Sequence, residues 1–240
     1  MSTAGMSDAG MSDAGIRQST GTVVAIDGPA GSGKSSVARA VARELGFQFL
    51  DTGAAYRALT WLILERGGDT DDEPTVIGSL GALDSLELTV DAAGQRVVID
   101  GHDVTEDIRT ERISGAVSGV ARTLAAREAV NVRFREIIAG ARPGIVAEGR
   151  DITTVVAPDA DVRVLLTADE DVRIRRRFGD VGGDQQQVGA SLAARDASDS
   201  RVVDFLNAAA GVTVVDSTHL TFDETVDAIV RLASEEQHHD

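Results

Sequence analysis

The residues best suited to chemistry in this sequence form a glycine-rich loop that ends in lysine and serine. Residues 28–35 (GPAGSGKS) fit the pattern G-x-x-x-x-G-K-[ST], whose backbone N–H groups surround phosphates while the lysine reaches the β and γ phosphates of a nucleotide. Lys34 is the only lysine beside 22 arginines among the 23 Lys and Arg residues, and a guanidinium fork replaces an ammonium poorly there. The sequence therefore predicts a site for a nucleoside triphosphate, in which Lys34 is also catalytic. Its predicted residues are Gly28, Pro29, Ala30, Gly31, Ser32, Gly33, Lys34, Ser35 and Ser36.

The segments on either side of this loop come in the order that the pattern requires. Residues 22–27 (TVVAID) are a β-branched apolar run typical of a buried parallel strand, and residues 35–45 carry apolar side chains at helical spacing. The start of that helix would present its N–H groups to the phosphates. The Ser35 hydroxyl would bind Mg²⁺, the cofactor expected with ATP.

Strand and helix patterns alternate along the rest of the chain. Further strands are predicted at 47–50, 144–148, 161–166 and 211–215, separated by segments long enough for helical crossovers. Together with residues 22–27 they predict an α/β fold in which a five-stranded parallel sheet carries helices on both faces.

Two segments interrupt this alternation. Residues 86–90 and 96–100 flank a polar loop, as in a β-hairpin, and we expect residues 84–110 to form a small inserted lobe. The glycine-rich, polar stretch 179–187 suits a mobile flap better than a packed element, and we expect it to belong to a mobile lid over residues 169–200.

The two ends of the chain have the composition of unpacked segments. The first 15 residues are three near-identical pentapeptides that contain all three methionines and offer no large apolar side chain for burial. We expect a disordered tail over residues 1–20, a frayed end over 235–240, and one phosphate-loop domain over 21–234.

Composition argues against several classes of protein. The formal net charge of −16 opposes nucleic-acid binding, so any arginines that bind a nucleotide must gather in a cleft. No stretch approaches the roughly 18 consecutive apolar residues of a membrane span, and the basic start and apolar run of a signal peptide are missing. With no cysteine present, these features favour a cytoplasmic protein without a membrane partner.

Polar residues follow the predicted strand 47–50, in the segment 51–57 (DTGAAYR). In one interpretation, Thr52 is the N-cap of a helix and Arg57 is a surface residue. In the other, Tyr56 and Arg57 project from the first turns of that helix toward the carboxyl edge of the sheet, where open α/β sheets bind their ligands. The segment alone leaves both interpretations open.

A second polar segment follows the predicted strand 144–148, where Glu148 is succeeded by Gly149, Arg150 and Asp151. An acid at a strand end beside a phosphate loop can hold Mg²⁺ through water, and Arg150 can clamp a phosphate and take part in catalysis. The alternative is a structural turn that an Arg150–Asp151 pair closes.

Two further groups of arginines also have two interpretations each. Arg127 shares a helix face with apolar residues of 124–140, and its side chain either extends to solvent or points into the cleft. The run 173–177 contains four arginines, which would stabilise a helix dipole if they lay near the end of a helix. Because four are more than a dipole needs, we predict that the run closes on the transferring phosphoryl group, with Arg173 and Arg177 catalytic.

Taken together, these segments resemble the bacterial cytidylate kinases of the P-loop nucleoside monophosphate kinase superfamily. The resemblance covers most of residues 21–234 and rests on 26–36 (IDGPAGSGKSS), 51–57 (DTGAAYR), 149–152 (GRDI) and 158–160 (PDA). It implies that the hairpin insert is the lobe that binds the nucleoside monophosphate.

The resemblance also implies which residues bind CMP. Ser118, Arg127 and Asp151 would read the cytosine edge, while Arg195 and Asp199 would hold the phosphate and ribose side. The implied CMP-binding residues are Thr52, Tyr56, Arg57, Ser118, Arg127, Arg150, Asp151, Arg195 and Asp199. The chain departs from the family pattern at Thr153, where glycine is usual, and at residues 199–201, which are one residue shorter than the usual D-S-x-R.

The reaction implied by the resemblance is phosphoryl transfer from ATP to CMP or dCMP with Mg²⁺, by a protein that we expect to be a monomer. A second hypothesis keeps the phosphate loop and changes the acceptor, as in shikimate or gluconate kinases. A third is a GTPase switch, but its guanine-reading N-K-x-D motif needs a second lysine, which this chain does not have.

Overall fold

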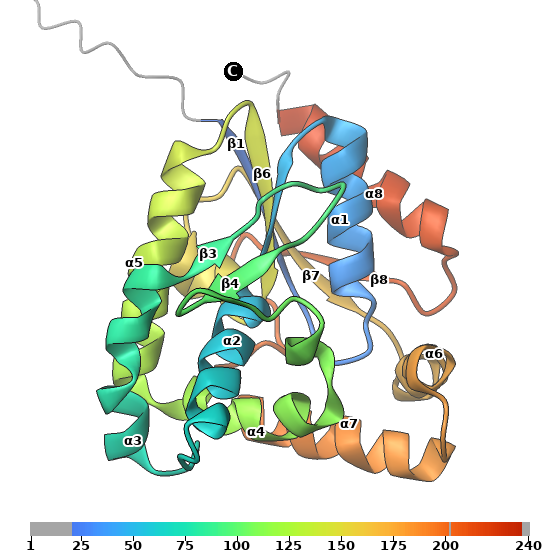
Figure 1. Cartoon of the computed structure of the whole chain (residues 1–240). Coiled ribbons are helices and arrows are strands. Elements are labelled where there is room, and N and C mark those ends of the chain that lie inside the picture. Colours follow the sequence, from blue (N-terminus) through green and yellow to red (C-terminus); the bar gives the residue numbers. More distant parts are fainter. Residues whose placement is uncertain (1–20, 202, 237–240) are drawn as a thin grey trace, which may run out of the picture.

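In the computed structural model, which describes residues 21–201 and 203–236, five parallel strands form the central sheet (Figure 1). Their order across the sheet is β2-β6-β1-β7-β8. All five predicted strands are present, with ends that differ from the expected ones by at most two residues, and the predicted fold class is confirmed. The strands are β1 (Thr22–Asp27), β2 (Gln48–Asp51), β6 (Gly144–Gly149), β7 (Val162–Thr167) and β8 (Thr213–Asp216).

Alternating side chains along these strands allow helices to pack on both faces of the sheet. In β1, Val24 and Ile26 pack on one side and Ala25 packs on the other. Helices α1 and α8 cover the side of Val24, whereas α2 and α5 cover the side of Ala25 (Figure 1). These helices are α1 (Lys34–Leu45), α2 (Thr52–Glu65), α5 (Leu124–Gly140) and α8 (Phe222–Glu236).

The parallel register brings acidic residues together at the carboxyl edge of the sheet. Glu148 at the end of β6 pairs with Ile26 of β1 on one side and with Asp51 of β2 on the other. Glu148 and Asp51 are buried, with 3% and 6% of their surface exposed. The glycine-rich loop leaves β1 at this same edge, so it adjoins two buried carboxylates.

A second, smaller sheet lies in the predicted insert. Strands β3 (Glu87–Leu88) and β4 (Val97–Ile99) pair antiparallel, as the hairpin prediction required. A third strand, β5 (His102–Asp103), pairs with β4. The sequence did not predict it, because two polar residues carry no strand pattern. The surrounding helices and turns are α3 (Glu73–Gly78), α4 (Glu111–Arg122), η1 (Leu80–Ser85) and η2 (Asp107–Arg109).

The expected lid region, residues 169–200, consists mainly of two helices, α6 (Glu170–Val181) and α7 (Gln185–Asp199). The described residues of 179–187 are exposed and lie at the end of α6, in the turn that follows it and at the start of α7, so the flap expected there stays a prediction. Asp184 caps the start of α7 by accepting hydrogen bonds from two backbone N–H groups at 2.7 and 3.4 Å. The glycine-rich composition thus marks a short junction between helices, and the mobility of the lid stays a prediction.

Residues 1–20 and 237–240 lie outside the described residues, and with them the predicted tail and most of the predicted frayed end. Helix α8 continues to Glu236, two residues into that predicted frayed end. Among the described helices, none is both long enough and apolar enough to cross a membrane.

Candidate active site

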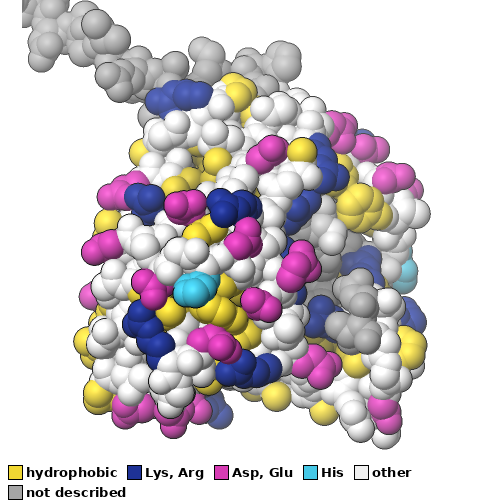
Figure 2. All heavy atoms as spheres, in the orientation of Figure 1, with side chains coloured by type: hydrophobic (Ala, Val, Ile, Leu, Met, Phe, Trp, Pro, Cys, Tyr) yellow, Lys and Arg dark blue, Asp and Glu magenta, His cyan; other side chains and the backbone are white. Residues whose placement is uncertain are grey.

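A cavity of about 360 Å³ opens at the carboxyl edge of the sheet, where the glycine-rich loop faces α2, α4 and α7. Of the described residues, eight basic and four acidic side chains line it, a formal balance of +4 in a chain whose formal net charge is −16. Figure 2 shows acidic side chains spread over the viewed face, with basic side chains between them. An excess of positive charge is therefore gathered in the cavity, where an anionic ligand would need it.

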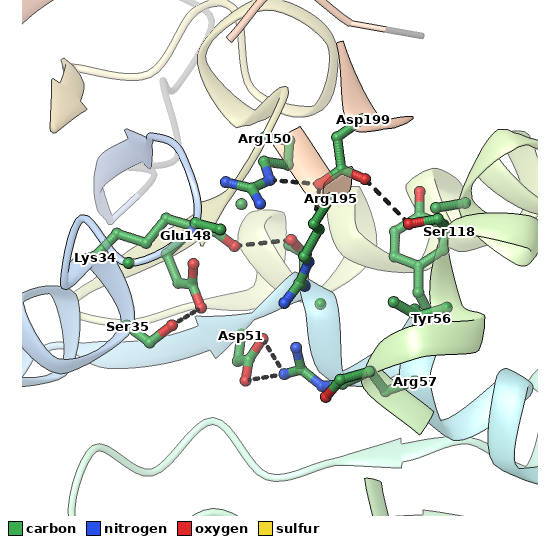
Figure 3. Close-up of a pocket in the computed structure, with 18 of the residues that line it drawn as sticks. Lys34, Ser35, Asp51, Tyr56, Arg57, Ser118, Glu148, Arg150, Arg195 and Asp199 are labelled. Carbon is green, nitrogen blue, oxygen red and sulfur yellow. Dashed lines mark hydrogen bonds and ion pairs between the residues drawn. The ribbon is translucent and has the colours of Figure 1, made fainter. Parts of the chain in front are cut away.

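Lys34 and Ser35, at the start of α1, lie on one side of the cavity (Figure 3). Lys34 Nζ donates a hydrogen bond to the carbonyl of Pro29 at 3.3 Å. Burial lowers the pKa of Lys34 to about 7, and the positive charge of Arg150 adds to this effect while Glu148 opposes it. The phosphates of a nucleotide would restore the charged form of this ammonium.

A hydroxyl and a carboxylate stand beside this lysine. Ser35 Oγ donates a hydrogen bond to Glu148 Oε1 at 2.7 Å. Burial raises the pKa of Glu148, the charge of Asp51 raises it further, and Lys34 opposes both. Oxygen ligands of this kind fit Mg²⁺. The described residues contain no group of three or more His, Cys, Asp or Glu that could hold a metal, so phosphates and water would have to complete the coordination.

A buried ion pair lies across the cavity from this hydroxyl. Arg57 Nη2 donates to both carboxylate oxygens of Asp51, at 2.8 and 3.1 Å. Burial by itself would raise the pKa of Asp51, but Arg57 and the Gln95 amide hold that pKa below its ordinary value. Arg57 Nε is buried and has no hydrogen-bond partner among the described residues.

Asp51, and not Thr52, is the N-cap of α2. Its side chain accepts a hydrogen bond from the Ala54 N–H at 3.0 Å. Thr52 instead donates its hydroxyl to the carbonyl of Glu148 at 2.7 Å and thereby ties α2 to the end of β6. The N-cap prediction for Thr52 is therefore wrong, because the aspartate one position earlier takes that role.

Arg150 connects the glycine-rich loop to α7. Its Nε donates to Asp199 Oδ2 at 2.9 Å, and its Nη1 donates to the carbonyl of Gly28. Arg195 projects into the space between this pair and the Asp51 side of the cavity (Figure 3). Burial lowers the pKa of Arg195 to about 10, and the charge of Arg150 contributes. Two guanidinium groups in one buried space would be stabilised by an anion.

Tyr56 and Ser118 lie on the side of the cavity opposite Lys34 (Figure 3). Beside them, Arg127 Nη2 donates to Asp151 Oδ2 at 2.5 Å, so Arg127 points into the cleft and not to solvent. Burial raises the pKa of Asp151, although Arg127 opposes the rise. Burial also raises the pKa of the Tyr56 hydroxyl. Donors, acceptors and an aromatic ring in one place are what recognition of a nucleobase requires.

Comparison with known proteins agrees with this geometry. A family model described as cytidylate kinase matches residues 24–235. A cytidylate kinase from Cutibacterium acnes is 48% identical over 212 residues, which cover 88% of this chain and 95% of that protein. The chain belongs to the cytidylate kinase family. Cytidylate kinases from Pelotomaculum thermopropionicum and Streptomyces griseus are 42% and 41% identical, over 88% of this chain and 95% and 91% of those proteins.

The resemblance to cytidylate kinases implied nine residues that bind CMP. All nine line the cavity. The structure therefore brings together side chains that lie between residues 52 and 199 of the chain. Of the predicted ATP-binding residues, six line the cavity and three do not. The six are Ala30, Gly31, Gly33, Lys34, Ser35 and Ser36, and the three are Gly28, Pro29 and Ser32.

The arginine run 173–177 divides into side chains with different surroundings. Arg177 lines the cavity, whereas Arg173 does not and instead donates to Asp196 Oδ2 at 2.6 Å. Arg176 donates to the carbonyl of Ser32 at 3.2 Å. The last turn of α6 holds no basic residue, so the helix-dipole interpretation of this run is wrong.

The sequence analysis did not predict several residues of the site. Arg109 and Arg122 line the cavity beside the predicted residues. Asp51 pairs with Arg57, and its place directly after the predicted strand 47–50 was the one signal that could have drawn attention to it. Asp196 had no such signal, because it accepts a hydrogen bond from the N–H of Ala30, 166 residues away along the chain.

Thr153, where the sequence resemblance led us to expect glycine, contributes to a buried network. Its N–H and its hydroxyl donate to Asp27 at 2.8 and 2.6 Å, and the N–H of Ile152 donates to Asp27 at 2.9 Å. Burial raises the pKa of Asp27, and these hydrogen bonds oppose the rise. The threonine hydroxyl therefore gives this carboxylate, which precedes the phosphate loop, a third donor.

Proposed function

We propose that this protein transfers the γ-phosphoryl group of ATP to CMP or dCMP, forming CDP or dCDP in pyrimidine nucleotide metabolism. The observation that carries the proposal is one cavity that brings Lys34 and the glycine-rich loop together with three arginines, Arg57, Arg150 and Arg195. The lysine and the loop amides suit the donor, and the arginines suit the phosphate of an acceptor. Membership of the cytidylate kinase family supports the same reaction.

The chemistry needs little acid–base assistance, because the acceptor phosphate is already a nucleophile. One of its oxygens would attack the γ phosphorus, and the bond from that phosphorus to the β–γ bridging oxygen would break as ADP leaves with the electron pair. Lys34, Arg150 and Arg177 would neutralise the charge that spreads over the transferring group. The predicted catalytic role of Arg173 stays a prediction.

The far end of the cavity would select the acceptor. Asp151 can accept a hydrogen bond from the amino group of cytosine, while Arg127 and Ser118 can donate to the acceptor atoms on its edge. Thr52, Tyr56 and Arg57 would contact the monophosphate. Arg195 and Asp199 would hold the phosphate and ribose side.

Mg²⁺ would be held by Ser35, with Glu148 acting through water, and when bound it would supply positive charge to the donor phosphates. The contact of these two side chains at 2.7 Å supports this assignment. We further propose that the protein acts as a cytoplasmic monomer with no nucleic-acid or membrane partner, and these points stay predictions.

The proposal is tested by coupled assay of ADP release with each candidate acceptor in turn. CMP, dCMP, UMP, AMP, GMP and shikimate are supplied with ATP and Mg²⁺. We expect kcat/KM to be highest for CMP or dCMP, by about tenfold or more over AMP and GMP. A base that leaves the buried polar side chains of the site without hydrogen bonds is rejected. Equal use of all nucleotides, or a preference for shikimate, would contradict the proposal.

A further inference from the structure

Asp196, on α7, holds both lid helices to the start of the glycine-rich loop. Its Oδ1 accepts a hydrogen bond from the Ala30 N–H at 2.9 Å, and its Oδ2 accepts one from Arg173 Nη1 at 2.6 Å. The same Arg173 nitrogen donates to the carbonyl of Ala30 at 2.9 Å. Both polar backbone groups of Ala30 are therefore bound by side chains of α6 and α7.

The contact between the lid helices and the loop is close as well as polar. A Cβ atom on Gly31 would lie 2.8 Å from the backbone oxygen of Arg173, so the backbone of α6 packs directly on the loop. Asp196 is 8% exposed, and the side chain of Arg173 is 14% exposed. Little water can replace these contacts, and loss of the carboxylate would leave buried donors unpaired.

Asp196 does not line the cavity, but its neighbours on α7 do. Arg195 precedes it, and Asp199 follows one helical turn later, so a shift of Asp196 would move both. Arg150 is shared between the two aspartates, with Nε 2.9 Å from Asp199 and Nη2 3.5 Å from Asp196. The hydrogen bond between Asp196 and Ala30 thus fixes the distance of Arg195, Asp199 and Arg150 from the glycine-rich loop.

We infer that Asp196 is a positioning residue that fixes α7 to the phosphate loop and thereby aligns Arg195, Asp199 and Arg150 with the donor. The inference rests on the proposed kinase function. In this role Asp196 contacts neither nucleotide. Its ion pair with Arg173 holds it in place. Removal of the carboxylate should weaken acceptor binding and turnover while ATP binding stays close to normal, because Lys34 and Ser35 keep their places.

The test measures binding of ATP and of CMP separately by isothermal titration calorimetry, and turnover by ADP release, in the full chain. In Asp196→Asn, we expect the Kd for CMP to rise about tenfold or more and kcat to fall, with the Kd for ATP within about twofold of wild type. Arg173→Gln breaks the same contact from the other side and should give the same split, which covers the case that Asp196→Asn fails to fold. Asp171→Asn, at an exposed position on α6 outside the arginine run, is the matched control and should behave as wild type.

The double variant Asp196→Asn with Arg173→Gln should lose less than the sum of the two single variants, because both changes remove the contact between Asp196 and Arg173. Wild-type kinetics in the folded single variants, an equal loss of ATP and CMP binding, or additive losses in the double variant would each overturn the inference. Wild-type protein that binds both nucleotides without transferring phosphate would contradict the proposed function and leave the binding test of Asp196 intact.

Discussion

Replacement of Arg57 by alanine would test the acceptor side of the cavity most thoroughly. Arg57 neutralises Asp51 through contacts at 2.8 and 3.1 Å, and its Nε is buried with no partner in the described part of the chain. In the proposed complex the same guanidinium binds the phosphate of CMP. The substitution should therefore change both catalysis and stability, by amounts that can be measured independently.

The kinetic effect follows from the loss of a hydrogen bond between charged groups. Such a bond contributes about 1.5 to 3 kcal/mol, which corresponds to about tenfold to 150-fold in kcat/KM for CMP. The KM for ATP should stay within about twofold, because Lys34 and Ser35 lie across the cavity from Arg57. A selective loss on the acceptor side is the expected signature.

The stability effect follows from the partner that Arg57 leaves behind. Asp51 keeps hydrogen bonds from the Ala54 N–H at 3.0 Å and from Gln95 Nε2 at 3.3 Å. Breaking a fully buried pair costs about 3 to 5 kcal/mol, so with these two donors retained we expect a loss of about 1 to 3 kcal/mol at pH 7. Because Arg57 lowers the pKa of Asp51, its contribution is present above about pH 4 and disappears as the pH falls through the lowered pKa. The stability difference between wild type and Arg57→Ala should therefore shrink in acid.

Coupled assay of ADP release and urea unfolding provide these two measurements. Arg66→Ala is a matched control at the end of the same helix, since Arg66 pairs with Asp100 at 2.8 Å while the two side chains are 53% and 48% exposed. This control should lose less than about 1 kcal/mol and keep wild-type kinetics. An unchanged kcat and KM for CMP in folded Arg57→Ala would refute the assignment of Arg57 to the acceptor phosphate.

Three further predictions address the donor side and the neighbouring network. Glu148→Gln should lower kcat about tenfold or more and raise the Mg²⁺ concentration needed for half-maximal activity, and an unchanged Mg²⁺ titration would contradict the metal role. Because burial lowers the pKa of Lys34 to about 7 and bound phosphates would raise it, ATP binding should take up protons near pH 7 and weaken as the pH rises above that value. Calorimetry in buffers of different ionisation enthalpy would measure this uptake, and none should occur if Lys34 is already fully charged. Thr153→Val removes the hydroxyl that donates to Asp27 at 2.6 Å and should lower the free energy of unfolding by about 1 to 2 kcal/mol, whereas an unchanged urea midpoint would count against that role.

The central sheet and the phosphate loop could be predicted because their signals are local. The apolar run 22–27, the glycine-rich loop and the helix that follows lie within 24 consecutive residues, and strands such as 144–149 are marked by their own composition. The resemblance to cytidylate kinases then gave nine acceptor-site residues, all of which line the cavity. Tyr56, Arg57, Arg127 and Arg150 were already candidates from their own segments, whereas Ser118, Arg195 and Asp199 could be named only from the family pattern.

Other features depend on contacts between distant segments and could not be predicted in the same way. The bond from Asp196 to Ala30 spans 166 residues and exists because α6 and α7 fold back onto the loop. Asp51 is the N-cap of α2, and the Thr52 hydroxyl instead donates to the carbonyl of Glu148 on a neighbouring strand. The stretch 179–187 has the composition of a loop, yet the cap at Asp184 lets α7 begin there.

Transfer of labelled phosphate is the most direct test of the claim that the loop with Lys34 holds the donor and the arginine-lined cavity holds the acceptor. Wild-type protein is incubated with [γ-³²P]ATP, Mg²⁺ and CMP, and the products are separated by thin-layer chromatography. We predict that the label appears in CDP and that Lys34→Ala and Arg57→Ala each reduce its formation. Label recovered as inorganic phosphate with none in CDP would contradict the proposed transfer.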